Sequence, residues 1–213
     1  MSTSRLYLNT YDEPVAVSPL SVQEPLDLTL TKNVLRFTST SEDALIQDWI
    51  ASARQLFETM TGRQLITATR IFGLDGFPYD GVIELPRPPL QSVTGVVYDD
   101  SSGVEQTLDE ATYTVIGSGL DAHAPRGRIV LGDGESWPSV IAGKNTVRVT
   151  YVAGYAERHD DIPPLIKAVL YDMVRKFHAR SDDQLPWTTQ LVLNNLQHSA
   201  AQTLRPWRQT WLV

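Results

Sequence analysis

The sequence predicts an α+β protein, a small helical bundle with an inserted antiparallel β module. Three observations predict this class. Apolar residues recur at helical spacing at 41–61 and again at 162–180, short runs rich in Ile, Val, Thr and Tyr fill the interval between them, and Gly and Pro separate those runs. The bundle is expected to consist of a helix hairpin and C-terminal helices, because two helical segments lie on either side of the strand-like region.

The segment 39–62 is the most clearly marked helix of the chain. Ser39 or Ser41 is expected to cap its N-terminus, with Glu42 completing a capping box after Ser39, and Gly62 is expected to end it. Its apolar positions share one face: Leu45, Ile46, Trp49, Ile50, Ala53, Leu56, Phe57 and Met60. A face of this length requires an apolar partner.

The helix predicted at 162–180 is the natural partner of that face. Pro163 and Pro164 suit its first turn. Its apolar stripe is equally long: Ile162, Leu165, Ile166, Val169, Leu170, Met173, Val174 and Phe177. We therefore expect these two helices to pack against each other.

Shorter elements complete the predicted order of the chain. A helix over 30–37, capped by Thr29, places Leu30, Val34 and Leu35 on one side, and a final helix is expected at 189–201. Strands are expected at 64–74, 82–85, 92–100, 104–108, 112–117, 127–131 and 146–154, with 92–100 and 104–108 forming a hairpin.

These elements predict five segments. Residues 1–27, with three prolines, form an extended N-terminal arm, which reaches a neighbour or is a loosely attached terminus. Residues 28–63 and 160–201 form the helical core, 64–159 form the inserted β module, and 202–213 form a C-terminal arm. The PRPP run at 86–89 is a stiff connector between strands, with a polyproline ligand as the alternative.

The composition excludes several classes of protein. The 213 residues include 18 basic and 25 acidic side chains, for a net charge of −7, which argues against a broad DNA-binding surface. No cysteine is present, so disulfides and thiolate metal sites are excluded. Without an apolar leader or a long apolar run, the protein is expected to be soluble, not exported and not bound to membranes.

No motif predicts catalysis, a metal site or a cofactor. The histidines, at 123, 159, 178 and 198, show no metal-ligand spacing, and Gly117-Ser118-Gly119 lacks the pattern of a nucleophile elbow. The glycine-rich stretch at 127–138 matches no phosphate-binding loop. The acidic pairs at 99–100, 133 with 135, and 160–161 are expected to be solvated turn residues. We therefore expect a protein that is not an enzyme.

The C-terminal arm contains the candidate binding residues. Trp207 and Trp211 lie four positions apart beside Arg205 and Arg208, and Trp and Arg are enriched at the energetic centres of protein interfaces. The alternative is that the two tryptophans fold back on the core of their own chain. We favour the first interpretation, in which Arg205, Trp207, Arg208 and Trp211 bind a partner.

Five stretches occur in a recognisable order: ETMTGRQLIT at 58–67, LPRPPLQSVTGVVY at 85–98 followed by GVEQTLDEATYTV, GRIVLGDGESWP at 127–138, VRVTYVAGY at 147–155 and IPPLIKAVL at 162–170. Together they resemble the head-tail connector (adaptor) proteins of tailed bacteriophages and gene transfer agents. The resemblance spans about 28–180. It implies a non-enzymatic virion protein of the neck, assembled in the host cytoplasm.

The resemblance also implies partners. It implies a homo-oligomeric ring, such as a dodecamer, below the portal protein, with a tail-side neck or stopper protein on its other face and DNA passing through its lumen without specific binding. The acidity of the chain suits such a conduit, because negative charge repels phosphate. The alternatives are a DNA-packaging accessory factor and an enzyme with an unrecognised site.

Overall fold

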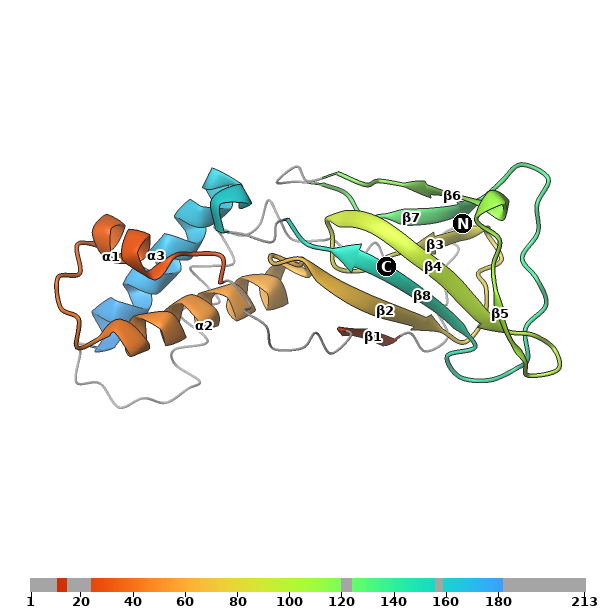
Figure 1. Ribbon diagram of the computed structural model, residues 1–213, viewed down its shortest axis with the longest axis horizontal. Helices are drawn as coiled ribbons and strands as arrows, with labels where there is room; N and C mark the ends of the chain where they lie inside the picture. Colours follow the sequence, from red (N-terminus) through yellow and green to blue (C-terminus); the bar gives the residue numbers. More distant parts are fainter. Residues whose placement is uncertain (1–10, 15–23, 120–123, 156–158, 182–213) are drawn as a thin grey trace, which may run out of the picture. The chain divides into compact units, whose positions relative to one another are not determined.

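The computed structural model describes residues 11–14, 24–119, 124–155 and 159–181, which form two compact units (Figure 1). The helical unit holds residues 24–66, 155 and 159–181, and the β unit holds 11–14, 67–119 and 124–154. Helices and antiparallel sheets are thus segregated, and the predicted α+β class is confirmed. The chain passes between the units between residues 14 and 24, at 66–67 and at 154–155. The sequence predicted the last two boundaries at 63–64 and 159–160.

The helical unit consists of three α-helices and a short 3-10 helix: α1 (Leu28–Leu35), α2 (Asp43–Thr61), η2 (His159–Asp161) and α3 (Pro164–Ser181). The predicted packing of α2 against α3 is confirmed, because their apolar faces share one core. Its buried residues include Ile46, Trp49, Ile50, Ala53 and Phe57 from α2 and Ile166, Val169, Leu170, Met173 and Val174 from α3. Burial of each large side chain contributes about 1.5–3 kcal/mol. Leu45 and Leu165, which the sequence placed in the two stripes, are exposed instead.

The two ends of α2 differ in how well the sequence predicted them. Gly62 ends the helix as predicted, with a φ of 67° and its N–H donated to the Glu58 carbonyl. The predicted N-terminal capping box is wrong, because α2 begins at Asp43 and its N-cap residue Glu42 makes no side-chain capping bond. Ser39 accepts hydrogen bonds within its own turn, from the N–H of Ser41, and so organises the loop before the helix.

The start of α1 also differs from the prediction. Asp27, not Thr29, is the N-cap, and its carboxylate accepts the Leu30 N–H at 2.8 Å. Arg36 ends the helix in the left-handed conformation, with a φ of 60°. Lys32 pairs with Asp43 at the start of α2, so an ion pair joins the two helices where the predicted capping box is missing.

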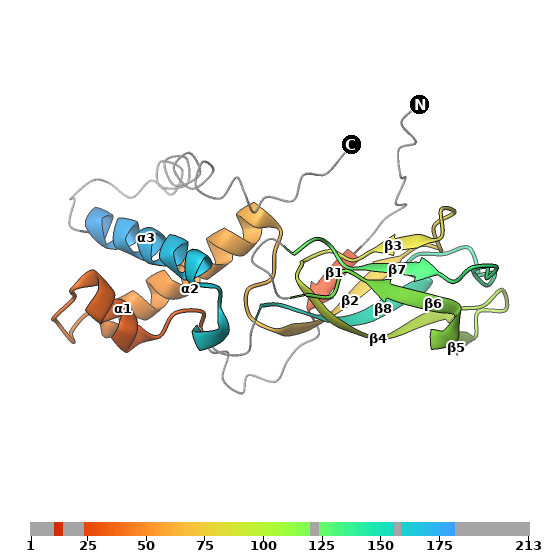
Figure 2. The ribbon, with the colours of Figure 1, turned by 90° about the horizontal axis from the view of Figure 1, so that it is seen from above.

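The β unit contains two antiparallel sheets (Figure 2). Its strands are β1 (Tyr11–Pro14), β2 (Ala68–Leu74), β3 (Val82–Glu84), β4 (Leu90–Asp99), β5 (Glu105–Thr107), β6 (Tyr113–Ile116), β7 (Arg128–Leu131) and β8 (Val147–Ala153), with a 3-10 helix, η1 (Glu110–Thr112), before β6. The strand orders are β1-β2-β8-β4-β5 and β3-β7-β6.

The predicted strands are present, with two differences. The strand expected from residue 64 begins at Ala68, because Leu65 is buried in the core of the helical unit and its N–H is bonded to the Glu58 carboxylate at 2.9 Å. The predicted hairpin is confirmed, since β4 pairs with β5. The strand β1 was not predicted: Tyr11–Pro14, within the predicted arm, pairs with β2.

Along β8, successive side chains alternate between the core of the β unit and a partly exposed position. Val147, Val149, Tyr151 and Ala153 are buried and the intervening residues are partly exposed.

Just before β7, a Cβ atom on Gly127 would lie 2.2 Å from Leu90 Cδ2 and 2.7 Å from Leu90 Cβ. Only glycine therefore permits this approach of backbone to the first residue of β4.

The proline run at 86–89 packs within the β unit. Pro88 and Pro89 are buried, the Pro86 carbonyl accepts the Tyr151 hydroxyl at 3.1 Å, and the Pro89 carbonyl accepts the Gly154 N–H at 3.0 Å. The run is a connector between β3 and β4, as predicted, and the alternative of an exposed polyproline ligand is wrong. Among the described residues, no helix has the length and apolar character needed to span a membrane.

Candidate interaction surfaces

The binding residues predicted from the sequence lie outside the part of the chain that the structure describes. Arg205, Trp207, Arg208 and Trp211 belong to 182–213, as does the helix predicted at 189–201. Their role stays a prediction. Candidate surfaces within the described residues come from side chains that the fold leaves exposed.

The clearest exposed apolar surface of the helical unit is on α1. Leu30 is 45% exposed and Val34 is 57% exposed, and their i, i+4 spacing puts them side by side on the helix. We call this pair the α1 stripe. The sequence placed Leu35 with them, but Leu35 packs against the core instead. The helix therefore has an inward apolar edge and a separate outward one.

The inward edge of α1 is unusual because its fully buried member is Thr31. The Thr31 hydroxyl donates a hydrogen bond of 2.6 Å to the Asp27 carbonyl, which satisfies its polar atom. Leu28 and Leu35 flank it at i−3 and i+4 and contact the core. A hydroxyl that is hydrogen-bonded to its own helix can thus be buried at low cost. With Thr31 facing the core, the α1 stripe faces away from it.

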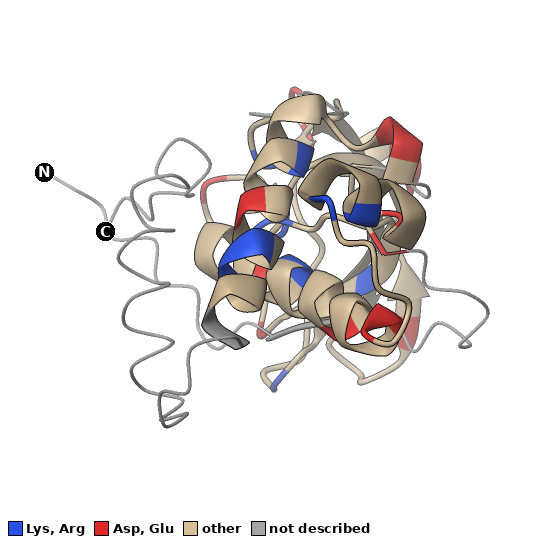
Figure 3. Cartoon of the chain, turned by 90° about the vertical axis from the view of Figure 1, so that its left-hand side faces the viewer, with Lys and Arg blue, Asp and Glu red and all other residues tan. Residues whose placement is uncertain are grey.

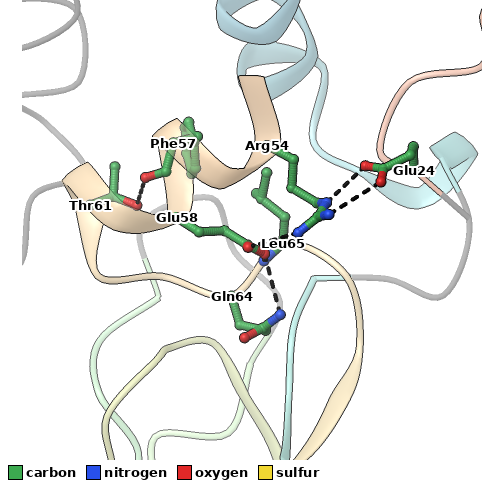
Figure 4. Close-up of polar contacts among 7 residues, drawn as sticks. All are labelled: Glu24, Arg54, Phe57, Glu58, Thr61, Gln64 and Leu65. Atoms are coloured by element: carbon green, nitrogen blue, oxygen red, sulfur yellow. Dashed lines mark hydrogen bonds and ion pairs between the residues drawn. The ribbon is translucent and has the colours of Figure 1, made fainter. Parts of the chain in front are cut away.

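A network around Arg54 attaches the residues before α1 to α2 (Figure 4). The Arg54 guanidinium donates to Glu24 at 2.8 and 3.2 Å and to Glu58, on the same helix, at 3.2 Å. Burial lowers the pKa of Arg54, but the hydrogen bond and charge of Glu24, with those of Glu58, raise it overall. Glu58 also accepts from Gln64 at 3.2 Å, and so links the segment at Glu24, α2 and the exit of α2.

A second polar contact is buried near the end of α2. Arg63 donates to the Tyr155 hydroxyl at 2.6 Å, and both residues are only 2% exposed. Burial raises the pKa of the Tyr155 hydroxyl, although the charge of Arg63 opposes the shift. This contact joins the end of α2 to the segment before α3, so we interpret it as a contact that stabilises the helical unit. In the view of Figure 3, basic and acidic residues both occur on the helices.

The histidines and the Gly117–Gly119 stretch, which the sequence analysis considered for metal binding and catalysis, make packing and hydrogen-bond contacts where they are described. The His178 ring lies 4.3 Å from that of Phe37 and 5.6 Å from that of Trp49, and His159 is paired with the adjacent Asp160. Gly119 donates its N–H to the Leu90 carbonyl, so the Gly117-Ser118-Gly119 stretch is bonded as a loop. Within the described ranges, no group of three His, Asp or Glu side chains could hold a metal ion. His123 and His198 lie outside those ranges.

The acidic pair at 99–100 has two separate structural partners. The Asp99 carboxylate accepts hydrogen bonds from both terminal N–H groups of Arg148, at 3.0 and 2.8 Å, and Arg148 also donates to Glu105 at 2.7 Å. The hydrogen bond from Arg148 holds the pKa of Asp99 below its usual range, and that bond also raises the pKa of Arg148. Asp100 accepts the N–H groups of Val104 and Ser102, which lower its pKa. Both carboxylates hold the β4–β5 turn.

Comparison with known protein families gives a match over part of the chain. Residues 25–116 match the family described as phage gp6-like head-tail connector protein. The predicted resemblance to head-tail connectors is confirmed. The matched segment begins just before the Asp27 cap of α1 and runs to the end of β6, so it includes the helix hairpin and the first half of the β unit. No curated protein sequence gives a significant match.

Solved structures with a similar fold come from gene transfer agent (GTA) particles. A chain from the "Neck of empty GTA particle computed with C6 symmetry" has a TM-score of 0.70 and 17% identity, with 95% of this chain and 97% of that chain covered. A chain from the "Virion of native gene transfer agent (GTA) particle" has a TM-score of 0.69 and 18% identity. A chain from the "Neck of native GTA particle computed with C12 symmetry" has a TM-score of 0.67 and 17% identity. The last two cover the same fractions, 95% and 97%. At this identity the likeness establishes a shared fold, and with the family match it supports a structural connector role.

Proposed function

We propose that the protein is a head-tail connector, a structural protein of the virion neck that joins a DNA-filled head to a tail. The family match over 25–116 carries this proposal. The fold supports it, because the similar chains belong to neck and virion structures of gene transfer agents. The connector acts by contact, and this role requires neither catalysis nor a cofactor. Assembly takes place in the host cytoplasm, before the protein becomes part of the particle.

The connector forms a homo-oligomeric ring, with twelve subunits as the proposed number. Two of the similar chains come from neck structures computed with C6 and C12 symmetry, which supports a ring of this kind. The α1 stripe supports it independently, since Leu30 and Val34 would be covered by a neighbouring subunit. A contact between two different surfaces of identical subunits closes into a ring when the rotation allows it.

DNA passes through the ring without specific binding. The net charge of −7 supports this, because a negative surface repels the phosphate backbone and does not retain it. We expect purified protein to bind duplex DNA no more tightly than the nonspecific range of about 10⁻⁴–10⁻⁶ M at physiological salt.

The C-terminal arm contacts the portal protein, and a tail-side neck or stopper protein contacts the other face of the ring. Arg205, Trp207, Arg208 and Trp211 support the portal contact by their chemistry, which combines large apolar rings with bidentate cations. Deletion of residues 204–213 should leave the thermal stability unchanged and abolish attachment to heads. A truncated protein that unfolds would instead assign the two tryptophans to the core of their own subunit.

A complementation experiment tests the proposed function. Particles made without this protein should accumulate as filled heads and free tails, and added wild-type protein should join them. Electron microscopy counts the joined particles. If the heads and tails join equally well without the protein, or if wild-type protein fails to restore joining, the connector assignment is wrong.

A further inference from the structure

Four loops meet at one end of the β unit (Figure 2), and we call this end the β tip. It consists of residues 75–81, 100–104, 109–112 and 132–146. The longest loop, 132–146, donates four hydrogen bonds to oxygen atoms of the neighbouring loops and strand ends. They run from Asn145 to Asp75, Trp137 to Pro78, Ile141 to Asp99 and Gly132 to Thr112. The loops are therefore bonded into one surface.

Tyr79 projects from this surface. Its side chain is fully exposed, although its backbone lies in a turn closed by a hydrogen bond from the Gly81 N–H to the Pro78 carbonyl at 3.3 Å. The Trp137 indole donates to the same carbonyl at 3.0 Å. The ring of Phe77 stacks on that of Trp137 with 4.7 Å between centroids. A backbone held by hydrogen bonds that presents one large amphipathic ring suits an interface anchor, because the backbone is already ordered and only two side-chain torsions must be fixed on binding.

Two more apolar side chains are exposed on the β tip. Val104 is 54% exposed and Ile141 is 39% exposed, and the Ile141 side chain lies over Gly103, next to Val104 in the chain. With Tyr79 they give the β tip three exposed large apolar side chains on a hydrogen-bonded frame. Tyrosine is one of the residue types on which interface affinity concentrates, and the two aliphatic side chains add apolar area to the β tip.

The charge of the β tip identifies the chemistry of its partner. Its four loops contain seven acidic residues and one basic residue, Lys144. Four of them accept backbone N–H groups: Asp75 from Asn145, Asp80 from Val82, Asp100 from Ser102 and Asp109 from Ala111. Five of the seven are exposed: Asp80, Asp109, Glu110, Asp133 and Glu135. This surface repels phosphate and attracts cationic side chains. It also repels a second β tip, so the tip is not a contact between like tips.

We propose that the β tip docks onto a basic surface of another protein of the particle, with Tyr79 inserted into an apolar pocket rimmed by Lys and Arg side chains. The proposal rests on the proposed connector function for the statement that the partner belongs to the particle. The β tip thus adds a further proposed contact region to the α1 stripe and the C-terminal arm, and its residues and charge differ from those of the arm.

Heads and tails purified from particles that lack this protein are the probes for the first test. Tyr79→Ala should leave folding unchanged and lower the yield of joined particles about tenfold or more at limiting protein, as loss of an interface anchor does. Ile116→Ala is the matched control, because Ile116 is also exposed in the β unit but lies at the far end of β6, opposite Arg128 of β7. Its yield should equal that of wild type.

The second test concerns charge. Asp109→Asn, Glu110→Gln, Asp133→Asn and Glu135→Gln together should weaken joining at low salt and flatten its salt dependence, since screening no longer removes an attraction. Wild-type joining should weaken as salt rises. Equal joining by wild type, the Tyr79→Ala variant and the charge variant would overturn this inference and leave the connector function intact.

Other outcomes separate the remaining explanations. If wild-type protein restores no joining, the proposed function fails, and this inference fails with it. If Tyr79→Ala lowers the oligomeric state of the purified protein, the occupant of the tip is a second copy of the chain, and the basic partner is wrong. Circular dichroism and thermal unfolding of each variant establish that the fold is retained.

Discussion

The helical unit and the β unit build their cores in different ways. In the helical unit, α2 and α3 satisfy most backbone groups internally and are joined by apolar side chains from two continuous stripes. In the β unit, strands far apart in the chain share hydrogen bonds, as β2 and β8 do over seven residue pairs, and backbone segments approach closely. Substitutions should therefore be costly through lost side-chain volume in the first unit and through blocked backbone approach in the second.

The largest effect is expected at Trp49 in the helical unit. Trp49 is 7% exposed and lies in the shared core of α2 and α3, so Trp49→Ala should lower the free energy of unfolding by about 3–5 kcal/mol. Leu45→Ala, on the same helix but exposed, should cost less than about 0.5 kcal/mol. Amide hydrogen exchange should show faster opening of α2 and α3 and unchanged protection of β2 and β8. Equal losses for both variants would contradict the predicted core.

The matching test in the β unit adds one methyl group. Gly127→Ala would place a Cβ atom 2.7 Å from Leu90 Cβ, which a change of side-chain rotamer cannot relieve, and should cost about 1–3 kcal/mol. Gly95→Ala is the control, because no heavy atom outside Gly95 and its two chain neighbours lies within 4 Å of the added Cβ. Urea unfolding of both variants measures the difference. A Gly127→Ala protein as stable as the Gly95→Ala protein would mean that the backbone approach is not required.

A smaller effect should appear in the response of the β unit to acid. Hydrogen bonds from Arg148 to Asp99, and from the N–H groups of Val104 and Ser102 to Asp100, lower both folded-state pKa values below the unfolded value of about 3.9. The stabilisation is therefore present above about pH 4 and is lost as pH falls through the folded pKa values. Unfolding free energy measured from pH 7 to pH 2 should fall less steeply in the Asp99→Asn/Asp100→Asn variant. An unchanged slope would contradict the role of these carboxylates.

The α1 stripe should affect assembly and not stability. Leu30→Lys/Val34→Lys introduces charge on exposed positions, so thermal unfolding should shift little while the ring dissociates into smaller species. Native mass spectrometry detects the change. Ile116→Lys, at an exposed position of the β unit, is the control and should assemble like wild type. Assembly retained by the double variant would remove α1 from the subunit contact.

Sequence patterns predicted where the helices and strands lie better than they predicted which of their residues are exposed. The periodic stripes of α2 and α3 identified their shared core, because several large residues per helix outweigh any single polar position. On α1, a short helix with apolar residues on two edges, the buried Thr31 decided the orientation. Its hydroxyl bond to Asp27 is visible only in three dimensions, so Leu30 and Val34 could not be recognised as exposed.

Contacts between distant segments limited the remaining predictions. β1 was missed because a four-residue run containing Pro14 has no strand signal without β2 beside it. The β tip was missed because its four loops are up to 71 residues apart in contacts such as that of Thr146 with Asp75, and each loop alone reads as a polar turn. The site predicted in the C-terminal arm lies outside the described residues and stays a prediction.

Electron microscopy of the purified protein mixed with portal-bearing heads tests the connector assignment most directly. We predict closed rings of subunits bound at one vertex of the head, with twelvefold averages and a clear central channel. Heads that carry no added density at that vertex, or protein that stays dispersed at every concentration with and without heads, would contradict the assignment.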